Sequence, residues 1–220
     1  KPSITSAKPW LNVGTVDFYN KIDEKDTSHF KGPHSGKCYV GIRFQAKYKE
    51  YAYVKLTEPL IKDRTYFFSM YVRLLDVSTV SIKQLGVYLS DSPFKMGMVF
   101  DPNGLIDTTY TSGLSGNYGW MPITGKYTAK GKEKYLIIGN FHENTKEDFV
   151  KKNKWKIFEL KEAFYYLDDV SLIDTVYKAP VKKDTSAKDT PPVIHQIADV
   201  KMVYFDNSSH KLQKNSLLII

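Results

Sequence analysis

Two adjacent acids, Asp168 and Asp169, are the side chains in this sequence best suited to chemistry. Paired carboxylates serve as general acid and base, or as oxygen ligands for a cation. Successive residues of a strand point to opposite faces, so simple alternation would not let both side chains bind one ion. Nothing in the sequence sets the carboxyl separation that glycoside hydrolysis requires. The alternative is that these carboxylates accept hydrogen bonds from backbone N–H groups at a strand end.

Other catalytic patterns are missing from the sequence. The five histidines have neither HxH nor HxxxH spacing, and no G-x-S-x-G motif marks a serine nucleophile. We therefore expect the histidines to be solvated or locally hydrogen-bonded. The one cysteine, Cys38, excludes an intrachain disulfide and a CxxC motif. It lies in an alternating segment that predicts a small, buried side chain.

Aromatic side chains offer a different chemistry, since exposed Trp and Tyr rings stack on sugar rings. The chain holds 12 Phe, 16 Tyr and 3 Trp. The candidates for ligand-facing rings are Trp10, Tyr19, Tyr118, Trp120 and Trp155. The alternative is that these rings fill the core of a β-sandwich. Trp155 lies in a lysine-rich stretch and is the ring most expected to be exposed, where it suits a protein partner as well as a glycan.

The charge favours some partners over others. Lys and Arg total 32 against 24 Asp and Glu, giving a net charge of +8. Only three of the basic residues are arginine, the residue that base and phosphate recognition favours, so we do not expect nucleic acid as the ligand. A lysine-rich solvated surface, or one that faces an acidic envelope polymer, remains. No apolar run approaches the roughly 20 residues of a membrane-spanning helix.

Short alternating segments predict the elements that must position these side chains. Along residues 66–74, one face of an extended chain carries Tyr66, Phe68, Met70, Val72 and Leu74. Similar segments predict strands at 38–44, 51–56, 86–89, 123–129, 135–141 and 164–173. Turn residues separate them, so residues 1–174 are expected to form a mainly β domain, an antiparallel β-sandwich or jelly roll. Residues 146–162 are the only helical candidate and could equally be a long basic loop.

The composition changes at about residue 175. Residues 175–192 are rich in proline and lysine and predict an extended, semi-stiff linker. Residues 193–220 predict a strand at 199–205, a turn and the start of a helix. These 28 residues are fewer than the roughly 40 that a self-standing domain needs. We therefore expect the sequence to be truncated within a second, α/β unit.

An ordered series of motifs carries a resemblance over about four-fifths of the chain. It includes Ala7-Lys-Pro-Trp10, Thr15-Val-Asp-Phe-Tyr-Asn20, His34-Ser-Gly-Lys-Cys-Tyr-Val-Gly-Ile42, Glu50-Tyr-Ala-Tyr-Val-Lys-Leu56, Tyr135-Leu-Ile-Ile-Gly-Asn-Phe141 and Tyr165-Tyr-Leu-Asp-Asp-Val-Ser-Leu172. Residues 1–174 thereby resemble the carbohydrate-binding-like jelly-roll module of Gram-negative envelope proteins. The segment from Val203 to Ser216 looks like the opening strand, turn and helix of an OmpA-like peptidoglycan-binding domain.

The resemblance implies a non-enzymatic envelope protein. An OmpA-like anchor would hold peptidoglycan through residues that lie beyond this sequence, on the periplasmic side of the outer membrane. The jelly roll would dock on an outer-membrane protein complex, such as a secretion or assembly machine. The resemblance also implies that Asp168 or Asp169 helps to hold a structural calcium ion, the one cofactor expected. The alternative function is a glycan-binding module for capsule or scavenged polysaccharide, with the aromatic candidates as its ligand contacts.

Overall fold

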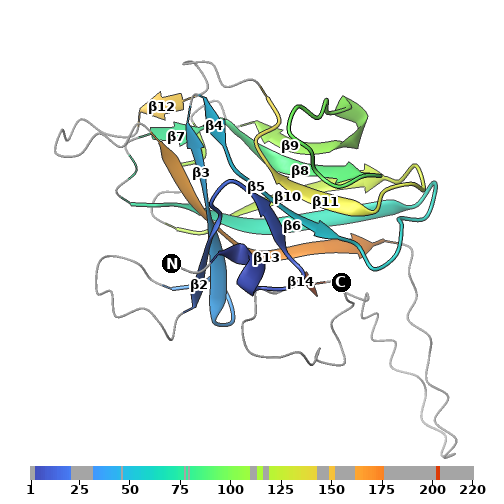
Figure 1. Cartoon of the computed structure of the whole chain (residues 1–220), viewed down its shortest axis with the longest axis horizontal. Coiled ribbons are helices and arrows are strands. Elements are labelled where there is room, and N and C mark those ends of the chain that lie inside the picture. The colour runs from blue at the N-terminus through green and yellow to red at the C-terminus, as the bar shows by residue number, and fades with distance from the viewer. Residues whose placement is uncertain are drawn as a thin grey trace, which may run out of the picture.

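The computed structural model describes residues 3–20, 32–45, 47–76, 78, 80–109, 113–115, 119–142, 149–151, 162–175 and 202–203. These residues form two antiparallel sheets that pack face to face, with a two-stranded ribbon at one end (Figure 1). The prediction of an antiparallel β-sandwich is therefore confirmed. No helix among the described residues is long and apolar enough to cross a membrane.

The larger sheet has the strand order β10-β6-β13-β3-β2, with two short strands paired to its members. Its strands are β10 (Met121–Thr128), β6 (Thr65–Leu74), β13 (Ala163–Asp174), β3 (Cys38–Gln45), β2 (Asp17–Asn20), β4 (Tyr48–Lys49) and β14 (Met202–Val203). The central strand β13 pairs with both β6 and β3, so the segment that carries the two aspartates runs through the middle of this sheet.

The smaller sheet has the strand order β1-β5-β11-β8-β9. Its strands are β1 (Leu11–Val13), β5 (Tyr51–Lys55), β11 (Tyr135–Gly139), β8 (Gln84–Ser90) and β9 (Leu105–Thr109). The end ribbon pairs β7 (Val80–Ile82) with β12 (Phe149–Lys151). Two short 3₁₀ helices, η1 (Ile4–Ser6) and η2 (Pro102–Gly104), lie at the N-terminus and before β9.

Both sheets turn alternate side chains into one core, as the period of two requires. On β6 the predicted apolar face is buried at every position, and Phe68 and Met70 have no exposed surface. The smaller sheet contributes Val54, Val87 and Leu136 to the same cluster. Cys38 lies in this core with 4% of its surface exposed, which confirms the prediction of a small buried side chain.

The sequence located the long strands and missed several short ones. All seven predicted strands are present, within a few residues of the expected bounds. The helical candidate at 146–162 is wrong where the structure describes it, because Phe149–Lys151 forms β12 and pairs with β7. The strands β1, β2, β7, β9 and β12 were not predicted, since segments of three to five residues give too little alternation to recognise.

The predicted linker and second unit lie almost entirely outside the described residues. The exception is β14, which pairs with β13 through Val203 opposite Val170 and Met202 opposite Ser171. This short strand falls inside the strand predicted at 199–205, and it joins the sheet of the sandwich. The division into a jelly roll, a linker and an OmpA-like unit stays a prediction.

Candidate functional site

The two predicted aspartates lie at a β-bulge in β13. Asp168 is opposite Tyr71 of β6, but the next paired residue, Ser171, is opposite Ser69, so two residues of β13 face one of β6. Asp169 has a φ of 49°, the left-handed conformation that Asp tolerates better than most residues. The bulge breaks the alternation that we expected for adjacent strand residues. Both carboxylates therefore contact the same loop segment, His34 and Ser35.

The Asp168 carboxylate holds backbone N–H groups. Its Oδ2 accepts hydrogen bonds from the backbone N–H of His34 at 2.8 Å and of Ser35 at 3.2 Å. Its Oδ1 accepts from the backbone N–H of Asp169 at 2.8 Å. Burial, together with the neighbouring Asp169 charge, raises the pKa of Asp168 to about 6. Asp168 thus fixes the path of the loop before β3 and is too deeply buried to face a ligand.

The Asp169 carboxylate fixes side chains of the same loop. His34 Nδ1–H donates to Asp169 Oδ2 at 2.5 Å, and Ser35 Oγ–H donates to Asp169 Oδ1 at 2.5 Å. The serine and the imidazole thus share one carboxylate, and in this arrangement the imidazole does not stand between the serine and the acid. This differs from a catalytic triad, in which the histidine bonds to the serine hydroxyl. The contacts orient the imidazole through Asp169 and leave it unbonded to the Ser35 hydroxyl.

His34 forms a cluster with two other rings. The imidazole stacks on Tyr71 with ring centroids 3.6 Å apart and planes 15° apart. Trp120 meets the imidazole nearly edge-on, at 5.9 Å and 73°. Tyr71 and Trp120 are half-buried, and 31% of the His34 side chain is exposed. We call the set of His34, Ser35, Tyr71, Trp120, Asp168 and Asp169 the His34 site.

A second group of aromatic rings lies next to the His34 site. Tyr19, Tyr39, Phe164 and Tyr166 form a buried cluster, against which Trp120 packs. Tyr19 and Tyr39 stack with centroids 4.9 Å apart. Burial, with smaller contributions from Tyr166 and Asp17, raises the pKa of Tyr19 far above its usual value. Their positions alternate with those of core residues, so they lie with Trp120 on the outer face of the larger sheet.

The contacts at the aspartates bear on the predicted calcium ion. Calcium needs about six to eight oxygen ligands, and here each of the four carboxylate oxygens accepts a hydrogen bond from an N–H or O–H group. Among the described residues, no group of three or more His, Cys, Asp or Glu side chains could hold a metal ion. Asp168 accepts backbone N–H groups, as the second expectation has it, but from a bulge within β13 and not from a strand end, whereas Asp169 accepts from two side chains. The calcium site stays a prediction without a described ligand set.

The structure separates the aromatic candidates. Trp120 lies at the His34 site, half-buried beside the two predicted aspartates. Trp10 is only 1% exposed and belongs to the core, so its ring offers no face to a ligand. Tyr19 is buried in the ring cluster against which Trp120 packs. Tyr118 and Trp155 lie outside the described residues, and their exposure stays a prediction.

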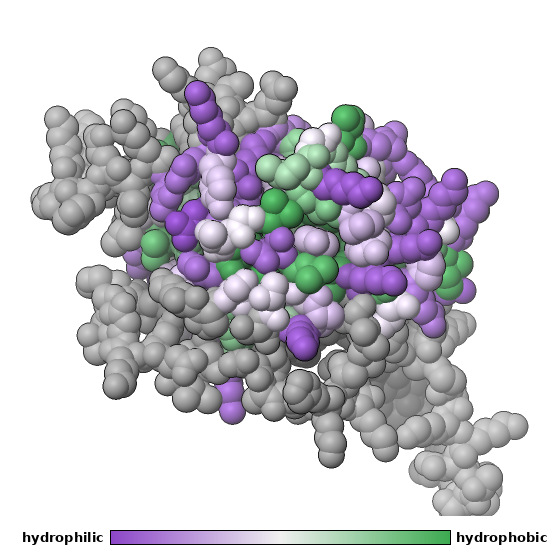
Figure 2. All heavy atoms as spheres, in the orientation of Figure 1, coloured by the Kyte–Doolittle hydropathy of each residue, from purple (hydrophilic) through white to green (hydrophobic). Residues whose placement is uncertain are grey.

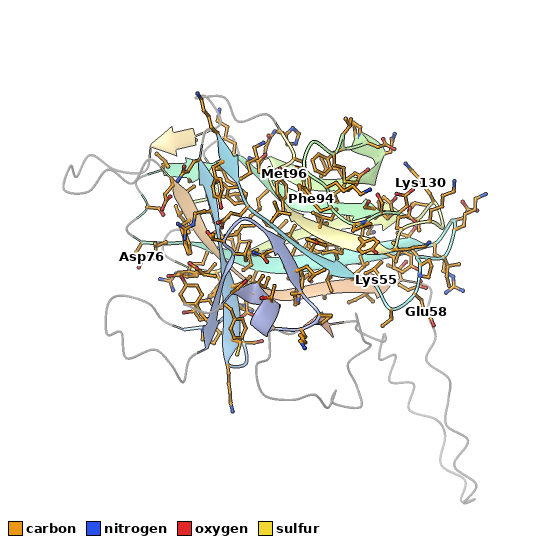
Figure 3. All side chains as sticks on the ribbon, viewed as in Figure 1. Lys55, Glu58, Asp76, Phe94, Met96 and Lys130 are labelled. Carbon is orange, nitrogen blue, oxygen red and sulfur yellow. The ribbon has the colours of Figure 1, made fainter. Side chains whose placement is uncertain are left out.

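A separate aromatic surface covers the outer face of the smaller sheet. Tyr51, Tyr53 and Tyr88 form its floor with Ile137, and the segment 91–104 between β8 and β9 packs across them. Phe94 stacks on Tyr51 at 4.6 Å (Figure 3). Phe100 meets Tyr88 edge-on at 5.1 Å. Rings of the chain itself therefore cover Tyr51 and Tyr88 on this face.

Sequence reasoning missed the central member of the His34 site. His34 carries no metal-binding spacing, and its partner Asp169 is 135 residues away along the chain. The signal that could have pointed to it is local. His34 follows the turn residues Gly32 and Pro33 and lies a few residues before the strand predicted at 38–44, a position from which a loop side chain can reach a neighbouring strand.

The comparisons with known proteins give distant similarities of fold. No protein-family model matches the chain, and no curated protein has a similar sequence. A xylan-binding CBM22-1 domain of Paenibacillus barcinonensis Xyn10C has a TM-score of 0.42 and 15% identity, covering 74% of this chain and 83% of that domain. TmCBM61, solved with β-1,4-galactotriose, has a TM-score of 0.40 and 13% identity, covering 79% and 94%.

A protein of a different kind shows a similar degree of likeness. The K1 cleaved adhesin domain of the Porphyromonas gingivalis Lys-gingipain has a TM-score of 0.39 and 14% identity, covering 74% of this chain and 96% of that domain. At TM-scores below 0.5, none of these similarities assigns a ligand to this chain.

Proposed function

We propose that the β-sandwich is a non-catalytic module that binds a glycan at the His34 site. The observation that carries the proposal is the cluster of three part-exposed rings, His34, Tyr71 and Trp120. Rings of this kind present an apolar face with a polar edge, which suits the C–H faces and hydroxyl groups of a sugar. The Ser35 hydroxyl donates to Asp169 instead of to the imidazole, so the Ser–His pair of a catalytic triad is not formed.

The buried carboxylates give the site its order. Asp168 holds the loop backbone, and Asp169 holds the imidazole and the Ser35 hydroxyl. A site whose rings are already fixed loses less conformational entropy when a ligand binds. The two aspartates therefore act as positioning residues, while Trp120 and His34 supply the contact surface.

The test is affinity electrophoresis of the 220-residue protein through gels that contain single soluble polysaccharides. We expect retardation by at least one of them, and a loss of about tenfold in affinity for Trp120→Ala, which corresponds to about 1.4 kcal/mol. Tyr53→Ala is the matched control, since Tyr53 is a half-buried ring on the other sheet. Absence of retardation by any polysaccharide, or equal losses for the two variants, would overturn the proposal.

We also propose, from the motif order of residues 193–220, that the complete protein is tethered to peptidoglycan on the periplasmic side of the outer membrane. The linker at 175–192 would set the reach of the sandwich, and the tether would raise its local concentration near an outer-membrane complex. The sequence resemblance supports this proposal. Its test is co-sedimentation of the complete protein with insoluble peptidoglycan, and a protein that stays in the supernatant would contradict it.

A further inference from the structure

The segment 91–104 exposes two large apolar side chains at its tip. Met96 is 83% exposed and Val99 is 90% exposed. The other exposed large hydrophobic residues among those described are far less exposed, at 37–49%. Figure 2 shows apolar side chains gathered on the face of the smaller sheet, with hydrophilic side chains around them. Scattered apolar residues are ordinary on a surface, but two nearly free side chains three positions apart form a distinct feature.

The tip of this segment, residues 95–99, is held at both ends by contacts with the sheet. On its N-terminal side, Phe94 stacks on Tyr51. On its C-terminal side, Phe100 packs edge-on against Phe141 with centroids 4.7 Å apart. Within the tip, the backbone N–H of Met98 donates to the carbonyl of Lys95 at 3.0 Å. The sheet thus holds both ends of the tip, while Met96 and Val99 stay almost fully exposed; Figure 3 labels Phe94 and Met96.

Asp101 fixes the C-terminal end of the segment through three further contacts. Lys130 Nζ donates to its carboxylate at 2.7 Å, and its own backbone N–H donates to the hydroxyl of Tyr88 at 3.3 Å. The side chain also accepts from the backbone N–H of Asn103, at the start of η2. The segment therefore returns to the sheet at a fixed point, and its tip is presented from a structured support.

The size of the tip favours a lipid surface over a protein. A stable protein interface buries about 800 Å² on each partner, which two side chains do not provide. Insertion into the interfacial region of a bilayer needs no complementary surface, because the apolar groups simply leave water. Burying a Met or Val side chain in this way is favourable in proportion to the apolar surface removed from water.

Charge around the tip favours anionic headgroups. Lys95 is exposed between Phe94 and Met96. The end of the sheet from which the segment leaves carries both signs of charge. Its exposed lysines are Lys55, Lys62, Lys130, Lys132 and Lys134, and its exposed acids are Glu58, Asp63, Asp91 and Asp101, the last of which is paired with Lys130. Lys95 is the exposed lysine of the tip itself. A lysine close to an anionic membrane surface is attracted to it.

We propose that Met96 and Val99 insert into the headgroup region of an anionic lipid bilayer, with Lys95 on the phosphates. The surface is separate from the His34 site and does not depend on glycan binding. The two apolar side chains and one lysine would give weak, reversible attachment. Such attachment would add to any tether elsewhere in the protein.

The test is flotation of the protein with phosphatidylcholine vesicles that either contain or lack phosphatidylglycerol. We expect binding to the anionic vesicles, a drop of tenfold or more for the Met96→Ser/Val99→Ser double variant, and a smaller drop for Lys95→Glu. The matched control is Leu11→Ser/Ile61→Ser, which removes two other exposed apolar side chains. Failure of the unaltered protein to float, or equal binding by the two double variants, would overturn the proposal.

A second measurement does not depend on the double variant. Val99→Cys labelled with an environment-sensitive dye should show a blue shift and higher intensity when anionic vesicles are added, because Cys38 is buried and the dye reports the tip alone. An unchanged spectrum would contradict insertion. Loss of a co-purified protein in Met96→Ser/Val99→Ser, without any vesicle binding by the unaltered chain, would assign the tip to a protein partner instead.

Discussion

His34 Nδ1 lies 2.5 Å from Oδ2 of Asp169, and this contact joins a loop before β3 to the bulge of β13. Asp169→Asn replaces one of the two carboxylate acceptors with an N–H₂ group, so one of the bonds from His34 and Ser35 is lost. We expect the free energy of unfolding to fall by about 1–3 kcal/mol. Urea unfolding measures the change.

A double-mutant cycle identifies the contact that causes this loss. His34→Ala and Asp169→Asn should together cost less than the sum of the separate losses, with a coupling of about 0.5–3 kcal/mol. Asp91→Asn, on the exposed surface, is the control and should change stability little. Additive losses would show that His34 and Asp169 do not depend on each other.

Asp168 should make stability fall as the pH rises towards neutrality. Burial and the Asp169 charge raise its pKa to about 6, above the ordinary value of 3.8, so the native state binds this proton more tightly than the unfolded chain does. The resulting stabilisation is fully present below about pH 4 and is lost as the pH passes through 6. A shift of this size corresponds to at most about 3 kcal/mol.

The measurement is urea unfolding across this pH range for the unaltered protein and for Asp168→Asn, whose side chain does not titrate. The difference in unfolding free energy, unaltered minus variant, should decrease from pH 4 to pH 7. Other titrating groups contribute to both proteins and largely cancel in the difference. A difference that is constant or that increases with pH would contradict the raised pKa of Asp168.

The long strands could be predicted because every second residue along them is apolar and faces the core. In β6, Phe68 and Met70 are apolar and buried, while Ser69 between them is only half-buried, so a period of two identifies both the strand and its core side. The same pattern predicted the sandwich. It could not order the strands within each sheet, since alternation says nothing about which strand lies beside which.

The His34 site could be predicted only in part. Asp168 and Asp169 stand out as adjacent acids, but the bulge depends on the left-handed backbone at Asp169, which no local pattern announces. Trp10 and Trp120 are equivalent as sequence candidates, and only the packing of the sheets buries one and leaves the other half-exposed. Both the bulge at Asp169 and the different burial of Trp10 and Trp120 depend on contacts between segments that are distant in the sequence.

Gly41 should tolerate no side chain, because an aromatic ring lies directly on it. A Cβ atom at this position would be 2.4 Å from Cζ of Phe164 and 2.9 Å from Cε2 of Tyr19. We expect Gly41→Ala to cost about 1–3 kcal/mol of unfolding free energy through overpacking. In a Phe164→Ala background most of that penalty should disappear, since the nearest atoms are gone. Equal penalties in the two backgrounds would place the cause in the Tyr19 ring or the backbone instead of in the Phe164 ring. Thermal unfolding of the four proteins distinguishes the outcomes.

Glu50 should be a costly carboxylate to alter, because it has no exposed surface and four hydrogen-bond donors face its two oxygens. Its Oε1 accepts from the backbone N–H of Thr15 at 3.0 Å, from the Thr15 hydroxyl at 2.7 Å and from Tyr48 OH at 3.0 Å. Its Oε2 accepts from the backbone N–H of Arg43 at 2.9 Å.

Glu50→Gln keeps the shape of the side chain but turns one acceptor into a donor that faces other donors. We therefore expect the free energy of unfolding, measured in urea, to fall by about 2–3 kcal/mol. Glu58→Gln, on the exposed surface, should change stability by less than about 0.5 kcal/mol. Equal effects at the two positions would mean that the Glu50 carboxylate does not hold the segment before β2 against β3.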